Sequence, residues 1–83
     1  MDKQQMVKLA EAKLAAAKLR VQAAHRLGTI AAYEQQAINP DYDGQSEVCM
    51  GKAEVERSLY AQQLAEADLL VAKAELSEEE NSL

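Results

Sequence analysis

Apolar residues recur at alternating intervals of three and four along two long segments of this 83-residue chain. That spacing keeps the apolar positions on one side of an α-helix. Between the segments lies a cluster of turn-forming residues, Asn39-Pro40-Asp41-Tyr42-Asp43-Gly44, which holds the only proline. The pattern therefore predicts a helix over about 3–38, an acidic turn over 39–45, a second helix over about 46–79, and a frayed C-terminus over 80–83.

Both predicted helices are long for a chain of this size. Each would have roughly 35 residues and a length of ~50 Å at 1.5 Å per residue, whereas helices of globular proteins average about 11–12 residues. Long helices joined by a short loop are typical of coiled-coil-like hairpins. We therefore expect a single all-α domain over 1–83, folded as a long antiparallel helical hairpin.

The spacing also predicts which residues face each other across the hairpin. If the numbers of facing residues add to about 85, Leu14 meets Val71 and Val21 meets Leu64, and alanines meet alanines between them. The predicted seam comprises Ala10, Leu14, Ala17, Val21, Ala24, Gly28, Ala31, Gln35 and Ile38, followed in the second helix by Met50, Ala53, Arg57, Tyr60, Leu64, Ala67, Val71 and Ala74.

Composition makes this an unusual seam. Sixteen of the 40 apolar residues are alanine, and the chain has no Phe and no Trp. Alanine at alternate seam positions permits close helix approach, so that backbone proximity replaces bulky packing. A two-helix unit with so few large residues is expected to be marginal when alone.

A second apolar stripe remains after the seam is assigned. Its members are Leu9, Ala12, Ala16, Leu19, Ala23, Leu27 and Ile30 in the first helix and Val55, Leu59, Leu69, Leu70 and Leu76 in the second. We expect both parts to open onto one face of the hairpin, which a soluble monomer would rarely leave exposed. We expect two hairpins to cover this face by pairing into a homodimeric four-helix bundle. The alternative cover is a different protein.

The charge distribution narrows the range of partners. Residues 1–38 carry a net charge of +3 and residues 39–83 carry −8, so the two halves are expected to attract each other. The lysines at 3, 8, 13 and 18 are scattered around the helix, which argues against nucleic-acid binding. The acidic second helix argues against membrane association. With no signal-like or membrane-length segment and a single Cys, a soluble cytoplasmic protein is expected.

Residues that could carry chemistry are few. The single His25, the single Cys49 and the isolated glycines make no catalytic, metal-binding or phosphate-binding constellation. The loop resembles an EF-hand at Asp41 and Asp43, but Met50 stands where a bidentate Glu is required. We expect no enzyme activity, no metal and no cofactor.

The most favoured function is therefore a non-catalytic protein–protein interaction module, an adaptor or an inhibitor. Its expected contact residues are Leu19, Leu27, Ile30, Val55, Leu59 and Leu69 on the second apolar stripe and Asp41, Tyr42 and Asp43 at the loop tip. The alternative is a homo-oligomer that holds a small anionic, nucleotide-like ligand through Arg26, Tyr33, Arg57 and Tyr60. For Arg57, a carboxylate partner such as Glu34 or Glu56 is also expected.

Overall fold

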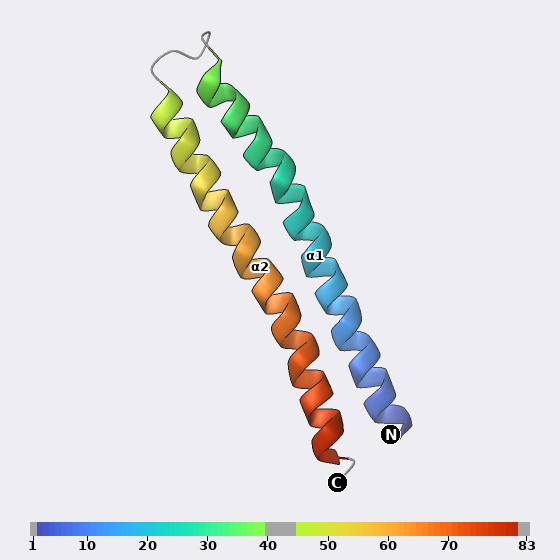
Figure 1. Cartoon of the computed structure of the whole chain (residues 1–83). Coiled ribbons are helices and arrows are strands. Elements are labelled where there is room, and N and C mark those ends of the chain that lie inside the picture. Colours follow the sequence, from blue (N-terminus) through green and yellow to red (C-terminus); the bar gives the residue numbers. More distant parts are fainter. Residues whose placement is uncertain (1, 40–44, 82–83) are drawn as a thin grey trace.

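The chain folds into two long α-helices that lie side by side and antiparallel (Figure 1). The computed structural model describes residues 2–39 and 45–81, in which α1 spans Lys3–Ile38 and α2 spans Ser46–Asn81. The molecule is a rod with principal extents of 62 × 15 × 10 Å. The predicted all-α helical hairpin is confirmed. The loop-tip residues Asp41, Tyr42 and Asp43 lie outside the described residues.

Local interactions define where α1 begins and ends. Asp2 is the N-cap: its Oδ1 accepts from the Gln5 backbone N–H at 2.8 Å, and its own N–H donates to Gln5 Oε1 at 3.2 Å. This reciprocal capping box satisfies two backbone donors at the start of the helix. At the other end Asn39 adopts extended angles, as expected for a residue that precedes a proline.

The helices contact each other through small side chains. Ala16 and Ala23 of α1 and Ala53 and Ala67 of α2 are completely buried, and Ile30 and Cys49 are nearly so. We call these six residues, with the half-buried side chains around them, the inner interface. The half-buried members include Leu9, Ala12, Leu19, Tyr33 and Ala37 of α1 and Leu59, Tyr60, Leu64, Val71 and Ala74 of α2. Alanine at the closest points lets the two backbones approach.

The offset between the two helices is close to the predicted one, but the predicted face of α1 is wrong, and with it the predicted facing pairs. Contacts between Gln22 and Gln63, Gln36 and Cys49, and Tyr33 and Lys52 all join residues whose numbers add to 85. In α2, Ala53 and Ala67 of the predicted seam are buried. In α1, however, Leu14 and Val21 are 58% and 57% exposed, and the stripe predicted to be the second face is the one that contacts α2.

A polar cluster in the inner interface explains this choice of face. Arg26 Nη1 lies 2.8 Å from Glu56 Oε2, and Arg26 Nε donates to Gln63 Oε1 at 2.9 Å. Gln63 in turn donates to Gln22 Oε1 at 3.4 Å. Glu56 and Gln63 of α2 are half-buried at the interface, where Arg26 of α1 pairs with both. The stripe predicted as the α1 seam would bring only Gln35 there, so the face that carries Arg26 is favoured.

Candidate interaction surfaces

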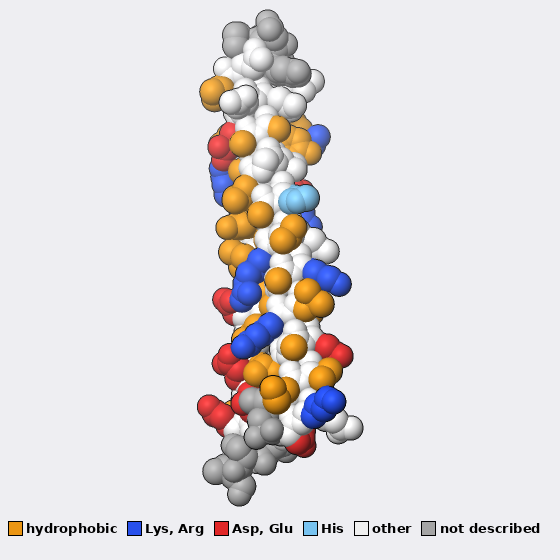
Figure 2. All heavy atoms as spheres, turned by 90° about the vertical axis from the view of Figure 1, so that its right-hand side faces the viewer, with side chains coloured by type: hydrophobic (Ala, Val, Ile, Leu, Met, Phe, Trp, Pro, Cys, Tyr) orange, Lys and Arg blue, Asp and Glu red, His pale blue; other side chains and the backbone are white. Residues whose placement is uncertain are grey.

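An apolar stripe runs along the side of α1 that α2 does not cover. Its residues keep the alternating three-and-four spacing and are all exposed: Val7, Ala10, Leu14, Ala17, Val21, Ala24, Gly28 and Ala31. We call this set the α1 outer stripe. Figure 2 shows hydrophobic side chains along the length of this face, with Lys and Arg on both sides of them.

Helix α2 has a stripe of the same design on its own uncovered side. Its residues are exposed and follow the same spacing: Val48, Gly51, Val55, Ser58, Gln62, Ala65, Leu69, Ala72 and Leu76. We call this set the α2 outer stripe. One shallow groove of about 400 Å³ is lined by Val48, Gly51 and Val55, and another of about 250 Å³ is lined by Leu69 together with Leu19 and Leu70. Side chains from another helix could enter both grooves.

The contact residues expected from the sequence do not form one surface. Ile30 is buried in the inner interface, and Leu19 and Leu59 are half-buried there. The prediction that the second stripe of α1 is an exposed face is therefore wrong. Leu27, Val55 and Leu69 are exposed as expected. On each helix the inner interface occupies one side, and the outer stripe lies on the opposite side, away from the other helix. The expectation that the stripes of both helices open onto one shared face is therefore also wrong.

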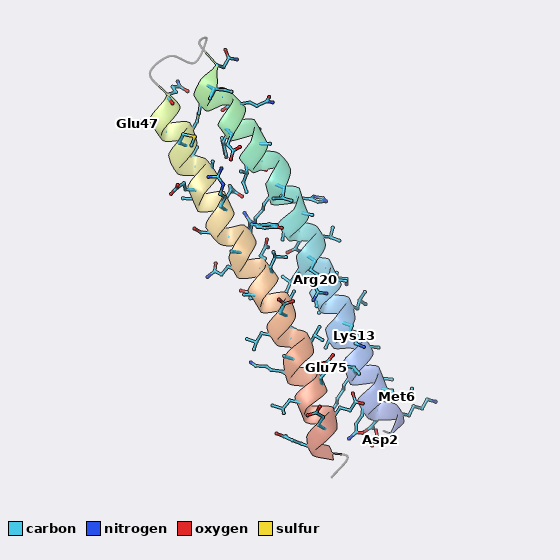
Figure 3. The ribbon with its side chains drawn as sticks, in the orientation of Figure 1. Asp2, Met6, Lys13, Arg20, Glu47 and Glu75 are labelled. Atoms are coloured by element: carbon cyan, nitrogen blue, oxygen red, sulfur yellow. The ribbon has the colours of Figure 1, made fainter. Side chains whose placement is uncertain are left out.

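Charged side chains of both signs flank the two outer stripes, with a positive balance beside the α1 outer stripe and a negative balance beside the α2 outer stripe. Lys13, Lys18 and Arg20 lie beside the α1 outer stripe, whereas Glu66 and Glu75 lie beside the α2 outer stripe. Figure 3 shows Lys13 and Arg20 on the N-terminal half of α1, the half that packs against the part of α2 that carries Glu75. Arg20 also reaches its own α2, where Nη2 lies 3.2 Å from Asp68 Oδ1 on the surface.

The residues considered for an anionic ligand already have partners within the hairpin. Arg26 is paired with Glu56, and Arg57 forms an ion pair with Glu34, which confirms the expected carboxylate partner. The Tyr33 ring has the Lys52 Nζ atom 5.7 Å from its centre, and Tyr60 is half-buried in the inner interface. Both guanidinium groups therefore face carboxylates of the same chain.

Cys49 and His25 occupy contrasting environments. Cys49 is buried and its thiol lies 3.7 Å from Gln36 Oε1, within hydrogen-bond distance, whereas His25 is exposed. Within residues 2–39 and 45–81, no group of three His, Cys, Asp or Glu side chains is arranged to hold a metal ion. Neither of the two described helices combines the length and apolar character needed to cross a bilayer.

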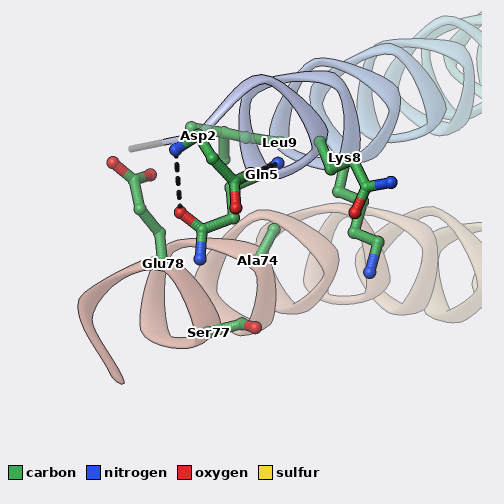
Figure 4. Close-up of a pocket in the computed structure, with 8 residues that line it drawn as sticks. Asp2, Gln5, Lys8, Leu9, Ala74, Ser77 and Glu78 are labelled. Carbon is green, nitrogen blue, oxygen red and sulfur yellow. Dashed lines mark hydrogen bonds between the residues drawn. The ribbon is translucent and has the colours of Figure 1, made fainter. Parts of the chain in front are cut away.

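A polar cleft of about 370 Å³ separates the helix ends opposite the loop (Figure 4). Asp2 and Gln5 line it from α1, but they are engaged in the capping box. Glu78 of α2 lines the cleft at the N-terminal end of α1, where the helix dipole favours a carboxylate. These residues complete the end of the hairpin and indicate no bound group.

Comparison with protein-family models, with curated proteins and with solved structures gives no match to this chain. The fold and the surfaces nevertheless define a structural class. The protein is a two-helix antiparallel hairpin whose inner interface is small and partly polar, and whose large aliphatic side chains lie mainly on the outside.

Proposed function

We propose that this chain is a non-catalytic protein-interaction module that acts by packing its outer stripes against helices of other protein chains. The observation that carries the proposal is the distribution of large apolar side chains. Twelve of them are exposed, whereas Ile30 is the one large aliphatic residue in the buried core of the described residues. A lone hairpin would leave this apolar surface in water.

The spacing of the exposed residues supports helices as the partners. Apolar residues at alternating intervals of three and four are the pattern by which one helix packs along another. Scattered surface leucines would carry no such implication. A contact of this kind fits an adaptor or an inhibitor, and an unpaired Cys49 fits a reducing compartment such as the cytoplasm.

The ligand-binding alternative gains no comparable support, because Arg26 and Arg57 are both neutralised by carboxylates of their own chain. The acidic loop tip at Asp41, Tyr42 and Asp43 remains a further contact site in this proposal.

Site-specific photo-cross-linking tests the proposal in cells that express the protein. A photoreactive residue at Leu14 or Leu69, in the two outer stripes, is expected to give adducts to discrete protein chains. The same residue at Thr29, which is exposed on the polar side of α1, serves as the control and is expected to give little product. Equal labelling from all three positions, or none from the outer stripes, would contradict the proposal.

A further inference from the structure

We propose that the chain that covers each outer stripe is a second copy of this protein: the α1 outer stripe of one copy packs antiparallel on the α2 outer stripe of the next. This inference rests on the proposed function and specifies its partner. Repeated from copy to copy, the contact makes an open row of hairpins. Four features of the described residues support it.

The first is the match of side-chain size. When the two outer stripes are aligned so that facing residue numbers add to 86, each large aliphatic residue of the central layers meets an alanine. The resulting layers are Ala10 with Leu76, Leu14 with Ala72, Ala17 with Leu69, Val21 with Ala65, Ala24 with Gln62, Gly28 with Ser58 and Ala31 with Val55. At the ends of the stripes Val7 meets Glu79 and Val48 meets Ile38. The sum of 86 exceeds by one the sum of about 85 between the two helices of one hairpin. The next copy therefore lies beside the first, shifted along the rod by only about one residue.

The second is the match of charge beside those layers. In an antiparallel coiled coil the positions next to the apolar layers pair across the contact. In this register three flanking pairs join opposite charges: Lys13 with Glu75, Lys18 with Glu66 and Glu11 with Lys73. Arg20 and Asp68 also lie opposite each other across the contact, but they are already paired within each chain. One pair, Glu34 with Glu54, is of like sign, but Arg57 already neutralises Glu34.

The third is that symmetric contacts place like charges together. If the α1 outer stripes of two copies packed antiparallel along their full length, Lys18 would meet Lys18 and Arg20 would meet Arg20. If the α2 outer stripe did so, Glu54 would meet Glu75, and Lys52 would meet Lys73. Like charges at such positions are destabilising. The charge pattern therefore favours α1 against α2 over either symmetric dimer.

The fourth is the position of two glycines. Gly28 and Gly51 lie inside the helices, where glycine is less favourable than alanine. Within one hairpin nothing requires them, because a Cβ atom at either position would meet no atom within 4 Å. Both glycines belong to outer stripes, and in the proposed contact they face Ser58 and Gln35, where a missing side chain lets the two backbones approach.

The contact does not close on itself. Each helix uses one side for the inner interface and the opposite side for the next copy, so each added hairpin presents another free outer stripe. Such a head-to-tail contact builds an open assembly unless its rotation closes a ring.

Sedimentation velocity of the full chain over a range of concentrations tests the inference. The mass of the wild-type protein is expected to rise beyond two chains as concentration increases. Lys18→Glu and Glu66→Lys should each weaken association about tenfold, and an equimolar mixture of the two variants should restore it, because each bears the charge that the other needs. Lys8→Glu, which makes the same change of charge away from the outer stripe, should associate like wild type.

Gly28→Ala supplies a second test, because it should change the stability of the hairpin and its association in opposite directions. It should raise the thermal stability of the dilute hairpin and at the same time weaken association. The row would be overturned if the wild-type protein formed nothing larger than a dimer and if Lys18→Glu and Glu66→Lys left that association unchanged. A strictly monomeric protein would also overturn the row. If outer-stripe cross-links to a different protein were then observed, the proposed function would stand without the row. If no such cross-links formed, both the row and the proposed function would be wrong.

Discussion

The inner interface and the outer stripes use the same spacing of residues but differ in what their side chains contact. The inner interface has alanine at its closest points and an Arg26–Glu56–Gln63 cluster at its centre. The outer stripes hold larger aliphatics such as Leu14 and Leu69, which remain exposed. Large aliphatic side chains are therefore divided between the inner interface, where Leu19 and Leu64 are half-buried, and the outer stripes, where they are exposed.

This difference has an energetic consequence. A buried alanine methyl contributes only about 1 kcal/mol, so the inner interface supplies modest hydrophobic stabilisation and relies on close approach and polar matching. The outer stripes leave further apolar side chains, such as Leu14 and Leu69, in water. We therefore expect the isolated hairpin to be weakly stable and to gain stability from whatever covers its outer stripes.

The largest expected difference concerns Ile30, which among the described residues is the one large aliphatic residue in the buried core. Ile30→Ala should lower the free energy of unfolding by about 3 kcal/mol, because it leaves a cavity between the helices. Leu14→Ala, on the α1 outer stripe, should cost less than about 1 kcal/mol at concentrations where the hairpin is monomeric. Urea denaturation followed by circular dichroism measures both. Equal losses would mean that the two stripes have been assigned to the wrong sides.

Neighbouring alanines sharpen the comparison by enlargement. Ala23 is fully buried and Ala24 is exposed. Ala23→Leu should force the helices apart and cost about 2 kcal/mol, whereas Ala24→Leu should change the stability of the monomer by less than about 0.5 kcal/mol. Thermal melts of the two variants give the answer, and a larger loss from Ala24→Leu would reverse the account.

The polar cluster should contribute less than the apolar contacts. The side chains of Arg26 and Glu56 are 30% and 21% exposed, so their ion pair is only partly screened by water. Glu56→Gln should cost about 1 kcal/mol by leaving the guanidinium without its carboxylate. Replacing both residues with Met should recover most of this loss, and a double-mutant cycle measures the coupling. A coupling near zero would show that the cluster does not select the face of α1.

The smallest effect is expected at the surface ion pair. The side chains of Arg20 and Asp68 are 47% and 77% exposed. Asp68→Asn should change monomer stability by no more than about 0.5 kcal/mol, and salt should reduce even that difference. Denaturation at low and high ionic strength tests this expectation. A loss as large as that of Glu56→Gln would place Asp68 in the structural core of the hairpin.

The hairpin itself could be predicted because its signals are local. The turn-forming residues 39–44 interrupt two continuous helical patterns, and so short an interruption makes the two helices antiparallel neighbours. The capping box of α1 was also readable, since Asp2 and Gln5 have the required spacing. The α2 side of the candidate surfaces followed from the same spacing, and Val55 and Leu69 are exposed as expected.

The face of α1 could not be predicted from spacing alone. Ala16 and Ala23 belong to one stripe and Ala17 and Ala24 to the other, so size and periodicity are nearly equal on the two sides. The deciding interactions are long-range and polar, between Arg26 of α1 and Glu56 of α2. The charged residues near the helix contact, rather than the alanines, carried the missing information.

Disulfide trapping tests most directly the central claim that the outer stripes join separate copies. Val21→Cys and Ala65→Cys, introduced together in a Cys49→Ser background, place one thiol on each outer stripe at facing positions of the proposed contact. Within one hairpin the two thiols lie on opposite sides and cannot meet. Mild oxidation is predicted to give a ladder of covalent multiples of the 9.1 kDa chain. An intrachain disulfide in the monomer would contradict the account, because it would mean that the α1 outer stripe faces α2 within the hairpin. A chain that stays reduced would contradict the contact between copies.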